Sequence, residues 1–296
     1  MQAKPRLLGA GLLLAGGLVG LAPGSQSDVV AQSPAAGRDK APSASTYFPS
    51  RTPDGQPDMQ GHWRAVPGGS YSVEDTALGV LGGGAMTPEL AERIRLGIRS
   101  SRIVDPPDGR IPYQPWAAER ATLIFDQHLQ PHPQFVDAAV HCLPGGPREM
   151  YHLEDQIIQA PGYVVVLFEF AHAYHVIALN DEAPLAENIT LTMGDAHGRW
   201  EENTLYAEST NFTDRNWLDI VGSFHSDAMR VRERFTPTGP DSITYEATIE
   251  DRNVYTRPWT MRVRLERIKG DGNGPIELFE HACHEGERDE PLLAPK

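Results

Sequence analysis

The chain has 296 residues, a formal net charge of −14 at pH 7 and only two cysteines. An acidic protein is repelled by nucleic acid and by anionic membranes, so neither is expected as a partner. The length suits one large domain with additional loops, and the charge favours neutral or cationic ligands.

The first 31 residues have the features of a secretory signal peptide. Lys4 and Arg6 precede an apolar run over 7–21, and Val29-Val30-Ala31 fits a signal-peptidase site. A membrane span needs roughly 20 apolar residues, and this run is shorter. We therefore expect a periplasmic or secreted protein with no membrane contact beyond the signal peptide. An uncleaved anchor is the alternative.

Two segments precede the strand-rich part of the chain. Residues 32–60 are rich in Pro, Ser, Ala, Gly and Asp, which predicts a flexible tether containing the turn-forming stretch Thr52–Asp58. Residues 61–155 are expected to form an arm rich in loops and helices that packs on the following domain. Within the arm, helices are predicted over 87–100 and 117–127.

From residue 156 to 290 the sequence predicts a mainly β domain, followed by a short tail over 291–296. Short connections without helices favour an antiparallel meander that closes into a lipocalin-like barrel, with a β-sandwich as the alternative. The predicted strands are Ile157–Gln159, Tyr163–Phe170, Tyr174–Leu179, Ile189–Met193, Arg199-Trp200, Thr204–Thr210, Ala228–Thr236, Ser242–Asp251, Trp259–Arg267 and Ile276–Cys283.

One of these strands carries a glutamate among its core-facing positions. Side chains alternate along a strand, so Glu233 shares a face with apolar residues of Met229–Phe235, while three arginines take the opposite face. A buried carboxylate is costly unless it is paired or used chemically, which makes Glu233 the strongest functional candidate. The alternative is a buried ion pair with an arginine such as Arg257 or Arg262.

Two nearby residues complete a candidate acid–base set with Glu233. The next strand places Tyr245 on its apolar face, where a tyrosine beside a carboxylate can donate a proton or orient a substrate. His225 lies just before the Glu233 strand, and its ordinary pKa is close to neutral. We predict His225, Glu233 and Tyr245 as catalytic residues. A core tyrosine and a turn-capping histidine are the alternatives.

Four further residues are predicted to bind the ligand. Trp200 and Trp259 can provide apolar walls. Asp251 lies at the inward end of the Tyr245 strand, and His172 extends one face of a very apolar strand. A small molecule or an oligosaccharide is the expected ligand.

Metal and serine-nucleophile chemistry are both disfavoured. Ser209, Ser223 and Ser226 lack a G-x-S-x-G context. No recognised metal-binding spacing joins the possible ligands His172, His175, Glu169, His281 and His284. No cofactor is expected.

The two cysteines, Cys142 and Cys283, are far apart in sequence, and each is next to a histidine. In an oxidising compartment a disulfide between them is the default, and it would tie the arm to the last strand. Two free thiols or a Cys2His2 metal site are the alternatives, although the spacing typical of such a metal site is absent.

Motifs along nearly the whole mature chain resemble a family of uncharacterised exported bacterial proteins. They include TPDGQPD over 52–58, CLPGGPR over 142–148, the HSD and ERF motifs over 225–235, TRPW over 256–259, and a match over 111–118. The resemblance implies a shared fold and carries no activity. At His175 the sequence departs from the family, which often has arginine.

Three hypotheses follow for the function. The first is an acid–base enzyme, a lyase or hydrolase, that acts on a carbohydrate or another hydroxylated small molecule in a polar barrel pocket. The second is a small-molecule-binding protein with the same pocket and no chemistry. The third and weakest is a structural or envelope-associated module that displays an acidic surface.

Overall fold

The computed structural model describes residues 47–76, 96, 100–127, 135–180, 183–270, 272, 276–279 and 281, all within one compact unit of residues 44–296. The signal peptide, most of the helix expected over 87–100, Cys283 and the tail lie outside the described residues. Among the helices that are described, none is long and apolar enough to cross a membrane.

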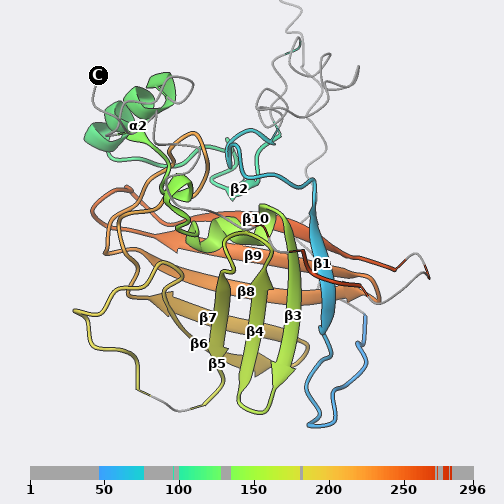
Figure 1. Ribbon diagram of the computed structural model, residues 1–296. Coiled ribbons are helices and arrows are strands. Elements are labelled where there is room, and N and C mark those ends of the chain that lie inside the picture. The colour runs from blue at the N-terminus through green and yellow to red at the C-terminus, as the bar shows by residue number, and fades with distance from the viewer. Residues whose placement is uncertain are drawn as a thin grey trace, which may run out of the picture. The chain divides into compact units, whose positions relative to one another are not determined.

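Nine of the ten described strands form a closed β-barrel (Figure 1). Strand β1 pairs with both β3 and β10, which closes the ring, and β2 (Ile103–Asp105) adds to β10 outside it. The barrel strands are β1 Gly61–Val66, β3 Glu154–Ala160, β4 Tyr163–Phe168, β5 Tyr174–Ala178, β6 Asp195–Glu201, β7 Thr204–Thr210, β8 Arg230–Gly239, β9 Ser242–Glu250 and β10 Trp259–Arg267. The expected barrel, rather than the alternative sandwich, is confirmed.

One pair of strands departs from the expected antiparallel meander. Strands β5 and β6 run parallel, and the chain joins them through residues 179–194. A parallel pair needs a long connection, and this connection takes the place of the strand predicted over Ile189–Met193. Leu191 is 40% exposed and forms only an isolated bridge with Phe212. Ile189 is also exposed and Met193 is only partly buried against the core, so the segment has no continuous buried face and the predicted strand is wrong.

The last predicted strand, Ile276–Cys283, is also wrong in its described part. Residues 276–279 have no regular structure, and His281 forms an isolated bridge with Phe170. Phe279 is 72% exposed, so no buried face holds this segment as a strand.

The N-terminal boundaries differ from the expected ones because apolar residues there belong to the core. Met59, in the expected tether, is completely buried and accepts a hydrogen bond of 2.9 Å from the Trp63 indole N–H. Its own backbone N–H donates to the Gln159 side chain at 2.7 Å. Residues 61–66, in the expected arm, form the strand that closes the barrel.

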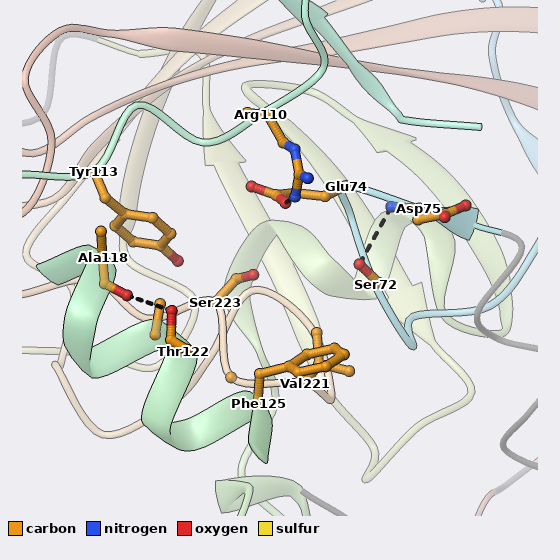
Figure 2. A pocket seen from close by; sticks show the side chains of 12 residues that line it. Ser72, Glu74, Asp75, Arg110, Tyr113, Ala118, Thr122, Phe125, Val221 and Ser223 are labelled. Carbon is orange, nitrogen blue, oxygen red and sulfur yellow. Dashed lines mark hydrogen bonds and ion pairs between the residues drawn. The ribbon is translucent and has the colours of Figure 1, made fainter. Parts of the chain in front are cut away.

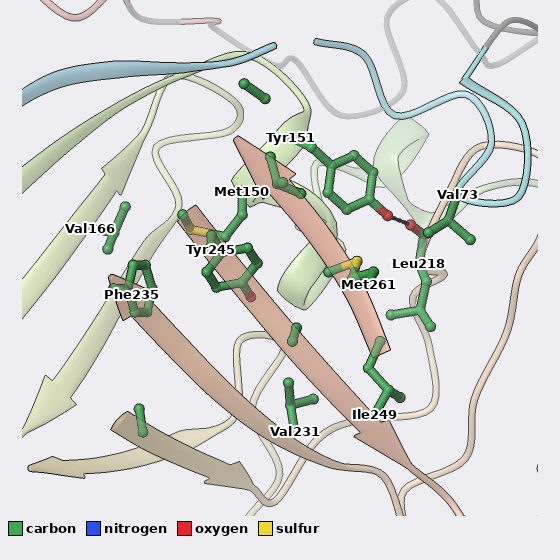
Figure 3. Close-up of a cluster of buried hydrophobic side chains, with 14 of the residues drawn as sticks. Val73, Met150, Tyr151, Val166, Leu218, Val231, Phe235, Tyr245, Ile249 and Met261 are labelled. Atoms are coloured by element: carbon green, nitrogen blue, oxygen red, sulfur yellow. Dashed lines mark hydrogen bonds between the residues drawn. The ribbon is translucent and has the colours of Figure 1, made fainter. Parts of the chain in front are cut away.

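The barrel interior is filled by large side chains. Trp63, Phe235 and Leu265 are each at most 1% exposed, and burying one such side chain stabilises the fold by about 1.5–3 kcal/mol. The 3-10 helix η4 (Gly146–Tyr151) is buried along its whole length and places Met150 beside Tyr245 (Figure 3). The CLPGGPR motif therefore leads into a segment that packs within the barrel.

Helix α2 (Pro115–Gln127) confirms the prediction of a helix over 117–127. Proline suits its first position, and the helix buries Ala117 and Ile124. Ile124 packs against the loop between β7 and β8 so closely that a Cβ at Gly222 would lie 2.1 Å from its Cγ2 atom. Helix α2 is thus held directly against this loop at one end of the barrel.

Candidate functional site

Glu233 is the centre of a buried hydrogen-bond network inside the barrel. It is 3% exposed. The Tyr245 hydroxyl donates to Oε1 at 2.8 Å, and His175 Nε2 and the Ser209 hydroxyl lie 3.0 Å from Oε2. The four residues come from β5, β7, β8 and β9, so the network links four strands across the interior.

Glu233 does not form the ion pair with Arg257 or Arg262 that the sequence offered as the alternative. Arg257 pairs with Asp105, and Arg262 pairs with Glu246 on the outer side of the sheet. The partner of Glu233 is His175, which the sequence analysis did not connect with it. That link depends on the registers of the three strand pairs between β5 and β8, which the sequence pattern does not contain.

The network holds Glu233 in its ionised form. Burial by itself raises the pKa of this carboxyl, but the nearby His175 and the hydrogen bonds from His175, Tyr245 and Ser209 together lower it below its ordinary value. Burial and the Glu233 charge raise the pKa of Tyr245 well above its usual range. A carboxylate with a lowered pKa is a weaker general base than one whose pKa lies near neutral.

The free space beside Glu233 is very small. A cavity of about 10 Å³ lies between this residue, His175, Ser209 and the η4 residues Gly146 and Met150. A volume of roughly 10–15 Å³ accommodates about one water molecule. Such a water can serve His175 Nδ1, which is buried without a hydrogen-bond partner in the described structure. A sugar does not fit in this space.

His225 is not joined to the Glu233 network. Its Nδ1 lies 3.0 Å from the Ser226 carbonyl oxygen, and its ring meets Phe212 edge-on with centroids 6.3 Å apart. Burial lowers the pKa of His225. No hydrogen bond among the described residues connects it with Glu233 or Tyr245, so the structure assembles two of the three predicted catalytic residues.

The four predicted ligand-binding residues have different surroundings, and no hydrogen bond among the described residues joins any two of them. Trp259 is completely buried with its ring 5.8 Å from that of Tyr255, and Trp200 is half-buried against the core. The Asp251 carboxylate accepts hydrogen bonds from the backbone N–H and hydroxyl of Ser226 at 2.6 and 3.0 Å. His172 is exposed in the turn between β4 and β5. Their binding roles stay predictions.

Some residues of the possible metal site and of the possible disulfide lie outside the described residues. Within the part of the chain that is described, no group of three or more His, Cys, Asp or Glu side chains could hold a metal ion. Of the possible ligands, His284 lies outside that part, as does Cys283. The disulfide between Cys142 and Cys283 stays a prediction.

A much larger cavity lies beside helix α2, and we call it the α2 cavity (Figure 2). Its volume is about 510 Å³, within the range of roughly 300–1,000 Å³ typical of small-molecule sites. The walls come from three parts of the chain: the segment that follows β1, the segment that leads into and includes helix α2, and the loop between β7 and β8. The lining residues are Ser72, Glu74, Asp75, Arg110, Tyr113, Ala118, Ala121, Thr122, Phe125, Val221, Gly222 and Ser223.

The α2 cavity combines apolar walls with a few polar groups. Phe125 and Val221 contribute apolar surface. Glu74 forms an ion pair of 2.6 Å with Arg110. The Tyr113 hydroxyl is buried without a hydrogen-bond partner in the described structure, and Figure 2 shows it directed toward the side of the cavity that holds Ser223.

Asp219 fixes the loop that forms one wall of the α2 cavity. Its carboxylate accepts hydrogen bonds of 2.8 Å from both the backbone N–H and the hydroxyl of Ser223, and of 2.9 Å from the Val73 N–H. Burial raises the pKa of Asp219 to about 6, although these hydrogen bonds act in the opposite direction. The Ile220 N–H also donates to the Ser70 carbonyl oxygen at 3.0 Å. These hydrogen bonds join two walls of the cavity, the segment after β1 and the loop between β7 and β8, and they need no ligand.

The α2 cavity was not predicted from the sequence. Ser223 was considered only as a nucleophile, and Tyr113 was not considered at all. Two signals were present: Tyr113 falls within the matched segment 111–118, and Gly222 precedes the HSD motif. Neither signal indicates that segments about 110 residues apart form one cavity, because that proximity depends on the tertiary fold.

Comparisons with known proteins add little to this picture. No family model matches the chain, and no curated protein matches it. A crystal structure of secretory abundant heat soluble protein 4 from Ramazzottius varieornatus is similar over 45% of this chain and 83% of that chain, at 13% identity and a TM-score of 0.25. A likeness this weak carries no argument about function.

Proposed function

We propose that this chain is a small-molecule-binding barrel protein and that its ligand occupies the α2 cavity rather than the barrel interior. The observation that carries the proposal is the difference in free volume. The α2 cavity measures about 510 Å³, and the space beside Glu233 measures about 10 Å³.

The walls of the α2 cavity support this proposal. A typical binding site is concave, mostly apolar and largely preformed, with a few polar groups that orient the ligand. The α2 cavity has apolar side chains along helix α2, and the Asp219 hydrogen bonds hold the facing loop in place. Export would expose this site to ligands outside the cytoplasm, and export itself remains a prediction.

The acid–base enzyme expected from the sequence is a second candidate. It is favoured by the 2.8 Å contact between Tyr245 and Glu233, a donor and a base in one network. Two observations weigh against it: the pKa of Glu233 is lowered, and the adjacent space holds about one water. A catalytic role would therefore require the barrel interior to open.

Fluorescence titration with N-phenyl-1-naphthylamine tests the proposed binding function. This uncharged aromatic probe brightens when it leaves water. We expect saturable binding to the wild type and at least tenfold weaker binding to Ala121→Trp, because the indole fills the cavity. Leu123→Trp is the matched control, since Leu123 lies on the same helix, is 49% exposed and does not line the cavity.

The two variants separate the possible results. Strong binding to Leu123→Trp together with weak binding to Ala121→Trp supports the α2 cavity as the site. Equal binding to both variants, or the absence of saturable binding to the folded wild type, contradicts the proposal.

A further inference from the structure

The α2 cavity contains one polar group whose hydrogen-bonding capacity is unused, and this group indicates which ligands fit. Resting on the proposed binding function, we infer that the cavity selects an uncharged molecule with an apolar, ring-containing body and an acceptor oxygen that receives a hydrogen bond from Tyr113. The inference concerns the ligand's chemistry, and three features of the walls carry it.

The first feature is the fixed position of the Tyr113 ring. It stacks on Phe224 with centroids 5.7 Å apart and an interplanar angle of 21°, and it meets Tyr255 at 5.6 Å. The Tyr113 backbone also forms a bridge with Tyr255. Packing on two aromatic neighbours leaves the ring little freedom, so its hydroxyl is presented to the cavity in one direction.

The second feature is the state of the Tyr113 hydroxyl. It is buried with no hydrogen-bond partner among the described residues, and an unsatisfied buried polar group is destabilising. Burial and the charge of Asp219 raise its pKa well above the usual range, although the nearby Ser223 side chain and Phe224 backbone act in the opposite direction, so the group remains a protonated donor. Neither neighbour is within hydrogen-bond geometry of the hydroxyl. The Ser223 hydroxyl donates its hydrogen bond to the Asp219 carboxylate at 2.8 Å. A ligand oxygen that accepts from Tyr113 would satisfy the buried donor.

The third feature is the charge of the walls. Arg110 is the one basic residue among the described lining residues, and Glu74 neutralises it at 2.6 Å. Asp75 adds a second carboxylate to the wall, and Asp219 lies behind Ser223. The whole chain carries a formal charge of −14. An anionic ligand would be repelled, whereas an uncharged one pays no such cost.

The remaining walls are apolar and suit a ring. Ala118 and Ala121 on helix α2 leave room where larger side chains would fill it, and Phe125 and Val221 offer flat and branched apolar surface. An aromatic or alicyclic body would bury against these side chains while its oxygen reaches Tyr113.

Three naphthalene probes test the inference separately from the proposed function. 6-Propionyl-2-dimethylaminonaphthalene carries a ketone oxygen, N-phenyl-1-naphthylamine carries no oxygen, and 1-anilinonaphthalene-8-sulfonate adds an anionic group to the latter scaffold. In Tyr113→Phe we expect about fivefold weaker binding of the ketone probe, because one hydrogen bond is lost. Binding of N-phenyl-1-naphthylamine should stay within about twofold of wild type. The ketone emission should also lie further to the red in wild type than in Tyr113→Phe.

The outcomes distinguish the two proposals. If the wild type binds neither uncharged probe, or Ala121→Trp binds both normally, the binding site itself is refuted. If both probes bind and Ala121→Trp blocks them, but Tyr113→Phe changes neither ketone affinity nor emission, the inferred recognition by Tyr113 is refuted. Sulfonate binding as tight as that of the uncharged parent at low salt overturns the inferred selectivity against anions. Far-UV circular dichroism and thermal unfolding confirm that each variant is folded.

Discussion

The barrel interior and the α2 cavity both contain buried polar groups, but they differ in whether those groups have hydrogen-bond partners and in the free volume beside them. Glu233 accepts three hydrogen bonds and has room beside it for about one water. The Tyr113 hydroxyl has no partner in the described structure and faces about 510 Å³ of free volume. A buried polar residue therefore indicates a binding site here only where an unsatisfied group and free space occur together.

The carboxylates of the two regions also differ in how they respond to pH. The folded-state pKa of Glu233 is lowered, so its stabilising contribution is present above about pH 4.5 and is lost as the pH falls through the folded value. The folded-state pKa of Asp219 is raised to about 6. Its contribution is fully present below the unfolded value and is lost as the pH rises through 6.

The largest expected effect comes from breaking the Glu233 network. Glu233→Gln leaves three buried donors facing an amide with a single acceptor oxygen, and removing one partner of a buried pair costs about 3–5 kcal/mol. Urea unfolding at pH 7 measures this loss. The exposed Glu208, 3.6 Å from Arg230, provides the matched control Glu208→Gln, which should cost less than about 0.5 kcal/mol.

Probe binding to Glu233→Gln sharpens the same comparison. Because the network lies outside the α2 cavity, the folded fraction of this variant should bind N-phenyl-1-naphthylamine with wild-type affinity. A folded variant that has lost probe binding would place the ligand in the barrel and contradict the distinction between the regions.

The next effect concerns the contact between helix α2 and the facing loop. Gly222 has φ +93°, and an added Cβ would lie 2.1 Å from Ile124 Cγ2. Gly222→Ala should therefore destabilise the fold by about 2–4 kcal/mol and weaken probe binding as the helix is pushed away. Gly55→Ala, at φ +85° with no atom within 4 Å, isolates the backbone strain and should cost about 1–2 kcal/mol. Equal losses in the two variants would show that the α2 contact is unimportant.

The pH dependence gives a smaller but distinctive effect. As the pH rises from about 4 to 6, the contribution of Asp219 to the free energy of unfolding should fall by about 2–3 kcal/mol, at 1.36 kcal/mol for each unit of pKa difference. Urea unfolding of wild type and Asp219→Asn across this range gives the difference. The variant cannot titrate, so the gap between the two curves should change over this range; a constant gap would contradict the raised pKa.

Much of the barrel could be predicted from the sequence, and the reasons are visible in particular strands. Thr204–Thr210 and Trp259–Arg267 were predicted with their observed bounds, because alternation and tight turns define both. The apolar segment Ile189–Met193 was predicted as a strand and instead crosses the surface. Local β-propensity could not reveal that β5 and β6 pair in parallel and leave this segment with only an isolated bridge to Phe212.

The candidate site was less predictable than the fold. Strand phase correctly turned Glu233 and Tyr245 inward, and their contact follows from adjacent strands. His175 lies three strands from β8 in the barrel order, and Tyr113 lies far in sequence from Ser223. Contacts of this kind depend on closure of the barrel and on the packing of its loops, which no local pattern encodes.

A crystal structure with bound 2-acetyl-6-bromonaphthalene tests the central claim most directly. The bromine gives an anomalous signal that locates the ligand independently of its fit to density. We predict a bromine peak in the α2 cavity with the acetyl oxygen within hydrogen-bond distance of the Tyr113 hydroxyl. A bromine peak inside the barrel beside Glu233 would contradict the account.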